Sequence, residues 1–340
     1  METKRFGTTE QEIAEAAALL QDGEVVGFPT ETVYGLGANA FDAAAVDKIF
    51  KAKGRPSDNP LIVHIAHRQD VDKLAQAVPE GAALCMEHFW PGPLTIVLPC
   101  VDGVPRNVTA GLRTVGIRMP DHVTALQLID AAGVPLAAPS ANRSGRPSPT
   151  TAEHVLEDLS GRIAGVVDGG AAGVGVESTV LDFTGDRPMI LRPGGVTREM
   201  LQDVIGEVGI DPALASGVGT PKSPGVKYTH YAPQGEMWLV EGEQDAAKIA
   251  ALTADAQAAG RRVGVLTTAE RAGQYRADVV IPCGKRSDLS TVAAGLYEAI
   301  RQFDHAGADV IYAEVFPETG VGLAVMNRLR KAASHRVIRA

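Results

Sequence analysis

The chain alternates helix-forming and strand-forming segments from its first residues, and this alternation constrains the fold more than any other feature. Thr9 and Glu12 form a capping box, and Gly23 marks the end of the helix that follows. Apolar residues recur between them at helical spacing: Ile13, Ala17 and Leu20. The apolar stretch 24–28 then reads as a strand. Such alternation is typical of helices packed against a sheet, so we expect an α/β protein.

The same rhythm continues to about residue 208. Strands are expected at 61–65, 94–98, 115–119, 135–138, 163–167, 178–183 and 189–191. Helices are expected at 42–54, 71–77, 81–89, 123–132 and 152–159. Strand-rich and helix-rich segments are mixed in order, which predicts a twisted mixed sheet with flanking helices.

Regular periodicity lapses between Gly209 and Gln234, where Gly, Pro, Ser and Ala predominate. A second α/β rhythm follows, with strands at 237–240, 263–267, 279–282 and 310–315 and helices at 244–259, 289–305 and 321–333. We therefore expect a larger domain at 1–208, a linker or lid at 209–235, and a smaller Rossmann-like α/β domain at 236–340.

Composition excludes several classes of protein. Apolar residues make up 45% and charged residues 21% of the 340 positions, which excludes wholesale disorder and collagen-like sequence. The net charge of −9 argues against an extended nucleic-acid-binding surface. No stretch has the length and apolarity of a membrane span or leader, so we expect a soluble cytoplasmic protein. The three cysteines are widely separated and fit neither a disulfide framework nor a zinc site, and no metal ligands are predicted.

A basic run at 51–60 lies between an expected helix and an expected strand. Lys51, Lys53 and Arg55 leave the helix end together, followed by the turn-forming sequence Pro-Ser-Asp-Asn-Pro. Such a run can bind a polyanion. Cations at a helix C-terminus equally complement the helix dipole, so this segment alone leaves both interpretations open.

Two further loops follow apolar strands and concentrate polar groups. The segment 28–37, Phe-Pro-Thr-Glu-Thr-Val-Tyr-Gly-Leu-Gly, alternates hydroxyls and ends in glycines that allow close backbone approach. The segment 138–149 carries hydroxyl, amide and guanidinium donors. Ligands of α/β proteins lie at such strand ends. An ordinary Thr-rich strand end and a solvated turn are the alternatives.

Three side chains in or beside apolar strands need partners. Arg118 ends a strand that is otherwise apolar, so it needs an anion, either a substrate carboxylate or an internal Asp or Glu. Arg192 ends another short strand and suits bidentate phosphate contact. His64 is more often a core residue than a ligand, and His67 points to the other face. Neither a dinucleotide fingerprint nor a P-loop is present, and no nucleophile elbow surrounds Ser178.

Taken together, the segments resemble a known family. FPTETVYGLG, KAKGRPSDNPL, PSANRSG, VESTV, LRPGG and SPGVKYTHYAP occur in the order and approximate spacing of YrdC-like threonylcarbamoyl-adenylate synthases of the long, two-domain form. The resemblance covers about the first 235 residues; the C-terminal domain is similar in position and rhythm. It implies an ATP-binding nucleotidyltransferase that joins L-threonine, bicarbonate and ATP, accompanied by Mg²⁺, into threonylcarbamoyl-AMP and pyrophosphate.

The resemblance also implies partners and site residues. The product would feed the machinery that makes N6-threonylcarbamoyladenosine at position 37 of tRNAs that read ANN codons, without strong nucleic-acid binding by this chain itself. The threonine side would use Thr32, His64, Arg118, the backbone at Ala138, and Ser178. The ATP side would use Lys53, Arg55, Asn59, Thr114, Ser140, Ser148, Arg192 and Tyr231. Lys53 and Arg55 would be the catalytic pair, because they would neutralise phosphate oxygens and the leaving pyrophosphate.

The linker motif at 223–233 is interpreted as a lid over the pocket. Pro224 and Gly225 would shape its turn, and Lys227, His230 and Tyr231 would present polar groups inward. Two alternatives are a noncatalytic RNA-binding YrdC-like module and an accessory protein of the hydrogenase-maturation type. The second usually carries acylphosphatase and zinc-finger segments, which this chain lacks.

Overall fold

The computed structural model describes residues 2–212, 214 and 230–340. By their own contacts these residues form two compact units. Unit 2 consists of 145–148, 174–176 and 230–340, and unit 1 consists of the other described residues. Each unit has its own sheet. Unit 2 also includes two short loops, 145–148 and 174–176, that come from the first two hundred residues of the chain.

The sheet of unit 1 is mixed, with eleven strands in the described residues. In spatial order they are β1 (Lys4–Phe6), β8 (Gly165–Val167), β2 (Val26–Phe28), β3 (Gly35–Asn39), β7 (Leu136–Ala138), β4 (Ile62–His64), β6 (Thr114–Arg118), β5 (Leu94–Pro99), β9 (Thr179–Asp182), β10 (Met189–Arg192) and β11 (Gly209–Ile210). Strand β6 is parallel to β4 and antiparallel to β5. The expected mixed sheet is confirmed.

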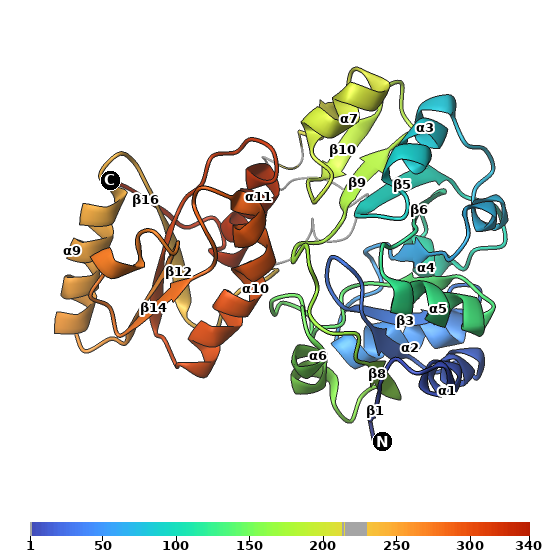
Figure 1. Ribbon diagram of the computed structural model, residues 1–340, viewed down its shortest axis with the longest axis horizontal. Coiled ribbons are helices and arrows are strands. Elements are labelled where there is room, and N and C mark those ends of the chain that lie inside the picture. The colour runs from blue at the N-terminus through green and yellow to red at the C-terminus, as the bar shows by residue number, and fades with distance from the viewer. Residues whose placement is uncertain (1, 213, 215–229) are drawn as a thin grey trace. The chain divides into compact units, whose positions relative to one another are not determined.

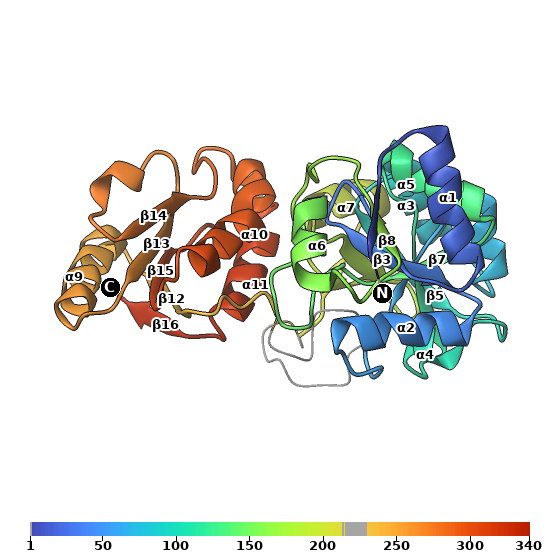
Figure 2. The same ribbon diagram turned by 90° about the horizontal axis from the view of Figure 1, so that it is seen from below.

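Helices cover both faces of this sheet. Figure 2 shows α1 (Glu10–Gln21) and α5 (Val123–Ala132) on one side, where they pack together, and α2 (Ala43–Lys53) and α4 (Arg106–Thr109) on the other. Helix α6 (Ala152–Leu159) packs against β2 and β8, and α3 (Glu80–Phe89) packs against α7 (Arg198–Ile205).

Local sequence explains the bounds of α2, which positions part of the site. The carboxylate of Asp42 accepts hydrogen bonds from the backbone N–H groups of Ala44 and Ala45, at 2.9 and 3.2 Å. Gly54 ends the helix in the left-handed conformation, at φ 63°. Both predicted ends are confirmed, and the chain leaves α2 directly into the basic run.

The expected helix at 71–77 is wrong. The chain instead forms a 3-10 helix, η1, at Arg68–Lys73. Ala75 then makes an isolated β-bridge with Cys100, so its backbone cannot continue in a helix. The pairing partner lies 25 positions away and gives no local signal.

Unit 2 contains an all-parallel sheet of five strands among its described residues. Their order is β14 (Val279–Pro282), β13 (Val263–Thr267), β15 (Val310–Glu314), β12 (Glu236–Glu241) and β16 (Val337–Arg339). Figures 1 and 2 show α9 (Asp245–Ala258) on one face, with α10 (Leu289–His305) and α11 (Gly322–Ala332) on the other. A short 3-10 helix, η2 (Ala272–Gln274), follows β13. This arrangement confirms the expected smaller α/β domain. None of the helices in either unit, as far as the structure describes them, has the length and apolarity needed to cross a membrane.

Candidate active site

One face of the unit 1 sheet carries most of the predicted threonine-side residues. Alternate residues of a strand share a face, so Thr114, Gly116 and Arg118 of β6 lie on one side. The parallel register places His64 of β4 directly beside Arg118. A small apolar cluster forms the floor of this face: Ile62, Val97, Val180 and Leu191.

Arg118 is the central cation of this face. Its side chain is buried, and its Nη1 donates to the hydroxyl of Thr32 at 2.9 Å, while Nε donates to the carbonyl of Gly92 at 3.3 Å. Its Nη2 lies 2.6 Å from Oε2 of Glu31. Of the two partners that the sequence left open for Arg118, the structure shows the internal carboxylate.

Glu31 is the residue that sequence reasoning missed. Its carboxylate is within ion-pair distance of Arg118, yet the angles fall outside those of a hydrogen bond, and neither buried oxygen has a hydrogen-bond partner in the described residues. Burying a carboxylate without hydrogen bonds is energetically unfavourable. Arg118 can therefore exchange Glu31 for another anion. The only sequence signal was its position between the two hydroxyls Thr30 and Thr32.

Ser178 and Arg192 extend the cluster across β9 and β10. Arg192 donates from Nε to the carbonyl of Ser178 at 3.0 Å and from Nη2 to its hydroxyl at 3.1 Å. The same hydroxyl lies 2.7 Å from the hydroxyl of Thr95. Arg192, which the resemblance assigns to ATP, therefore contacts a residue assigned to threonine.

His64 is held neutral in this cluster. Burial, and then the positive charges of Arg118 and Arg192, lower the pKa of its imidazole to about 3. Its Nδ1 lies 3.2 Å from the carbonyl oxygen of Ile62, and its ring packs edge-on against Phe28. At neutral pH it can therefore act as an uncharged hydrogen-bonding group.

Lys53 and Arg55 form a second cluster at the end of α2. The buried Nζ of Lys53 donates to the carbonyl oxygens of Ser140 and Asn142 and makes no ion pair with a carboxylate of the described residues. Arg55 donates to the carbonyl of Asn59 at 3.1 Å. Burial, and then the charge of Arg55, hold the pKa of Lys53 well below its usual range. An anionic ligand would relieve both effects.

The two clusters lie at opposite ends of the same strands. Asn59 precedes β4 and Thr114 begins β6, whereas His64 and Arg118 end these strands. The five residues of β6, Thr114–Arg118, are four steps apart from end to end and span about 13 Å in an extended strand. The predicted site in unit 1 is thus elongated along the sheet rather than gathered at one point.

The remaining predicted residues differ in their surroundings. Ala138 ends β7 and pairs with Ile62 of β4. Ser148 and Tyr231 are both buried and both belong to unit 2. Of the proposed lid at 223–233, residues 223–229, including Pro224, Gly225 and Lys227, lie outside the described residues.

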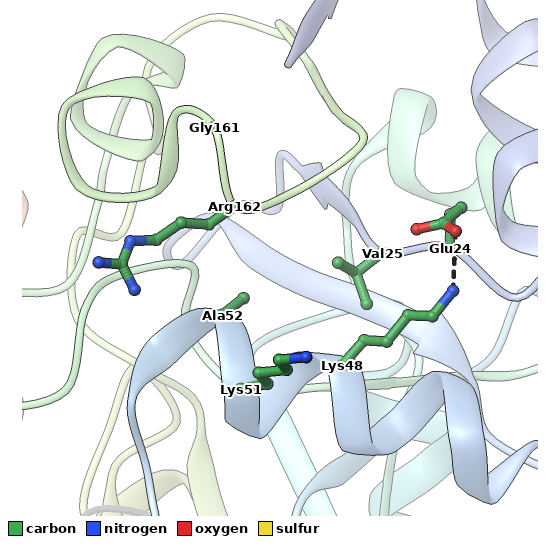
Figure 3. A pocket seen from close by; sticks show the side chains of 7 residues that line it. All are labelled: Glu24, Val25, Lys48, Lys51, Ala52, Gly161 and Arg162. Carbon is green, nitrogen blue, oxygen red and sulfur yellow. Dashed lines mark hydrogen bonds and ion pairs between the residues drawn. The ribbon is translucent and has the colours of Figure 1, made fainter. Parts of the chain in front are cut away.

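A cavity of about 370 Å³ lies beside α2, and its lining includes none of the predicted site residues (Figure 3). Its lining is Glu24, Val25, Lys48, Lys51, Ala52, Gly161 and Arg162. Lys48 is paired with Glu24 at 2.7 Å. Lys51 thus lines this cavity while Lys53, two positions on, is buried against Ser140, so the basic run divides between two places.

In the stretches 2–212 and 230–340, no group of three or more His, Cys, Asp or Glu side chains is arranged to hold a metal ion.

The fold and this site define a two-domain α/β protein whose larger domain holds buried cations at both ends of two central strands. A family model described as "Telomere recombination" (Sua5, YciO and YrdC) matches residues 18–194. A second model, "Threonylcarbamoyl-AMP synthase, C-terminal domain", matches residues 196–334. The chain belongs to the Sua5/YciO/YrdC family, in its form with a Sua5 C-terminal domain.

Similar proteins span the whole chain. The threonylcarbamoyl-AMP synthase of Bacillus subtilis is 58% identical over 338 residues, covering 99% of this chain and 97% of that protein. The Pyrococcus abyssi enzyme of the same name is 51% identical, covering 97% and 96%. The crystal structure of P. abyssi Sua5 complexed with L-threonine superposes with a TM-score of 0.94, at 48% identity and with 100% of both chains covered.

Proposed function

We propose that this chain is a threonylcarbamoyl-AMP synthase, which joins L-threonine, bicarbonate and ATP and releases pyrophosphate. Full-length similarity to two enzymes of that name, and to a Sua5 structure that binds L-threonine, supports the proposal. The observation in the chain itself that carries it is Lys53, a buried cation that hydrogen-bonds to carbonyl oxygens and makes no direct ion pair with a carboxylate of the described residues.

The reaction must bring two anions together. The α-ammonium of threonine loses a proton, its nitrogen attacks the carbon of bicarbonate, and water leaves to give a carbamate. A carbamate oxygen then attacks the α-phosphorus of ATP, the bond from that phosphorus to the bridging oxygen breaks, and pyrophosphate departs. Fixed cations at the site lower this barrier by positioning and electrostatic stabilisation, without a covalent nucleophile.

The cluster at the ends of β4 and β6 suits threonine. Arg118 would bind the α-carboxylate after exchanging Glu31 for it, while Thr32, Ser178 and the neutral His64 offer hydrogen-bonding groups for the hydroxyl. The backbone at Ala138 would complete the contacts.

The cluster at the end of α2 suits the nucleotide. Lys53, Arg55 and Asn59 would bind ATP together with Thr114, Ser140, Ser148, Arg192 and Tyr231. Lys53 and Arg55 would balance the charge on the phosphates and on the leaving pyrophosphate. Mg²⁺ would arrive with ATP, held chiefly by phosphate oxygens.

The product would serve a second enzyme. Threonylcarbamoyl-AMP is a mixed anhydride that a transferase can use to modify N6 of adenosine at position 37 of ANN-decoding tRNAs. A noncatalytic RNA-binding module is the second candidate, and no observation in the described residues favours it.

The deciding experiment combines product detection with two variants. Purified protein with L-threonine, bicarbonate and Mg-ATP should yield threonylcarbamoyl-AMP by mass spectrometry, and pyrophosphate release should need all three substrates. Arg55→Ala should fail chiefly on ATP and Arg118→Ala chiefly on threonine. Pyrophosphate release that is independent of threonine, or RNA binding without any pyrophosphate release, would refute the proposal.

Selectivity offers a second test. A site that hydrogen-bonds the threonine hydroxyl should discriminate against valine, which lacks the hydroxyl, by roughly 4 kcal/mol or more. Serine lacks only the methyl group, so discrimination against it should be only about 1 to 3 kcal/mol. Serine should therefore be the better alternative substrate.

A further inference from the structure

The side chain of Tyr231 is packed inside unit 2. It is 4% exposed, and its ring lies 5.1 Å from the ring of Tyr297, centroid to centroid, at an interplanar angle of 32°. The guanidinium carbon of Arg328 lies 6.0 Å from the centroid of the Tyr231 ring. Tyr297 belongs to α10 and Arg328 to α11, and both are fully buried.

The backbone of Tyr231 is strained. Its φ of 65° lies in the left-handed region, which costs a non-glycine residue about 1–2 kcal/mol. Such a conformation persists only where the surroundings fix it. The ring contacts with Tyr297 and Arg328 supply that fixation, so they restrain the backbone as well as the side chain.

Helix α10 binds a second segment beside Tyr231. Its Arg301, which is 1% exposed, donates from Nη2 to the carbonyl oxygen of Pro147 at 2.6 Å. The next residue along the chain from Tyr231, Ala232, donates its N–H to the carbonyl of Gly145 at 3.1 Å. Arg301 and Tyr297 are four positions apart and share one face of α10. That face therefore holds both 145–148 and 230–232.

A third segment lies directly on the same helix. A Cβ at Gly175 would lie 2.4 Å from Cα of Ala294 and 2.5 Å from the carbonyl oxygen of Ala293, and the φ of Gly175 is 79°. Only glycine meets both requirements. Three segments that are distant in sequence thus dock on one helix.

We propose that α10 and α11 position Ser148 and Tyr231, with Tyr297, Arg301 and Arg328 as the positioning residues. The role of the C-terminal domain is then to hold two ATP-side residues. This rests on the proposed function, in which those two residues contact ATP. Fully buried guanidinium groups are costly to desolvate, and apolar side chains of similar volume often pack as well or better. Their presence on this face is explained if they fix its three docked segments.

The test uses the full chain and a matched control. Tyr297→Leu and Arg328→Met remove the contacts to Tyr231, and Tyr297→Phe keeps the ring. The control is Arg336→Met. Like Arg328, Arg336 lies near an aromatic ring, that of Trp238 at 5.8 Å. It donates to the carbonyl of Met237, and both of these partners lie outside the three segments.

Two readouts are needed. The KM for ATP in pyrophosphate release should rise about tenfold or more in Tyr297→Leu and Arg328→Met, while L-threonine affinity by calorimetry stays within about twofold. Amide hydrogen exchange at 230–232 and 145–148 should become faster in both. Tyr297→Phe should restore the ATP KM, and Arg336→Met should alter neither readout.

Each outcome decides one question. An unchanged ATP KM despite faster exchange refutes the positioning role, and so does an equal rise in Arg336→Met, which would show general destabilisation. Unchanged exchange shows that these side chains do not hold the segments. If the unmodified chain releases no pyrophosphate at all, the proposed function fails, while the exchange data still test the holding of Tyr231.

Discussion

Both units bury arginine or lysine side chains, yet they neutralise them differently. In unit 2 the fully buried Glu314 pairs with Arg271 at 3.3 Å and Arg286 at 3.0 Å, and the hydroxyls of Thr267 and Tyr275 donate to it as well. In unit 1 the ammonium group of Lys53 donates hydrogen bonds to carbonyl and amide oxygens.

This difference indicates that the Glu314 cluster serves stability and that Lys53 serves function. Arg271 also makes a two-pronged contact with Asp245, which raises the pKa of the guanidinium, so the charges of this cluster are balanced by its own carboxylates. Lys53 makes no direct ion pair with a carboxylate of the described residues; burial and then the charge of Arg55 lower its pKa, and the charges of Asp158 and Glu177 oppose that shift only in part. A complete network stabilises a domain, whereas a buried cation without a direct ion pair is suited to an anionic substrate.

Breaking the network in unit 2 should have the largest effect on stability. Glu314→Gln removes a fully buried carboxylate from two partly exposed arginines, of which Arg271 keeps Asp245, and it should lower the free energy of unfolding of unit 2 by about 1–3 kcal/mol. Of the two tryptophans, Trp90 lies in unit 1 and Trp238 in unit 2, so Trp238 fluorescence during urea unfolding, in a Trp90→Phe background, reports this unit. Where the variant is folded, its KM for threonine should be unchanged. A loss under about 1 kcal/mol would contradict the comparison.

Removing the charge of Lys53 should have the opposite result, with a large effect on activity and a small effect on stability. Lys53→Met should lower kcat/KM by about 10² to 10³, equivalent to roughly 2.7–4 kcal/mol. The free energy of unfolding of unit 1 should change by less than about 1 kcal/mol, because the lost hydrogen bonds to two carbonyls are offset by the relieved desolvation. Trp90 fluorescence in a Trp238→Phe background measures the second quantity. A stability loss as large as that of Glu314→Gln would show that Lys53 is structural.

The burial of His64 beside two arginines should also appear in the pH dependence of the stability of unit 1. The folded pKa of His64 is about 3 and its unfolded value about 6.5, so between these values only the unfolded chain takes up the proton. Unit 1 should therefore lose up to about 1.4 kcal/mol per pH unit from this residue as the pH falls below about 6.5. Unfolding midpoints at several pH values should show a shallower slope in His64→Asn, and an equal slope in both proteins would contradict the assignment.

The smallest effect on stability and activity is expected for a substitution of Lys51. Lys51→Met should change the free energy of unfolding by no more than about 0.5 kcal/mol and should leave pyrophosphate release unchanged, because Lys51 is exposed in the cavity beside α2. The same two assays apply. A large loss of activity would place that cavity in the site.

Features that depend on neighbouring residues could be predicted from the sequence. Asp42 and Gly54 fix the ends of α2 through their own hydrogen bonds and backbone conformation. The predicted 289–305 helix and 263–267 strand match α10 and β13 residue for residue, because strong periodicity and flanking turn residues mark both.

Features that depend on distant residues could not be predicted. Strands β1 and β16 are three residues long, and each exists only by pairing with a strand far away in sequence. Helix α7 was also missed, although Thr197 caps it, because it adjoins the irregular segment after β10.

The site shows the same limit. Motifs indicated that Arg118 and Lys53 are important, but not their partners. Glu31 lies 87 positions before Arg118, and the carbonyl of Ser140 lies 87 positions after Lys53. The loop between β2 and β3 supplies Glu31 for the first contact, and the loop after β7, which pairs with β3, supplies Ser140 for the second. Neither leaves a pattern in the local sequence.

The docking of three segments on α10 has a practical consequence for anyone shortening this protein. A chain cut after residue 208 would lose α10 but keep Pro147 and Gly175, whose neighbours on that helix would be gone. Such a fragment would retain the buried lysine and arginines of the larger sheet while exposing two loops to water. Its behaviour would therefore describe a different molecule from the full chain.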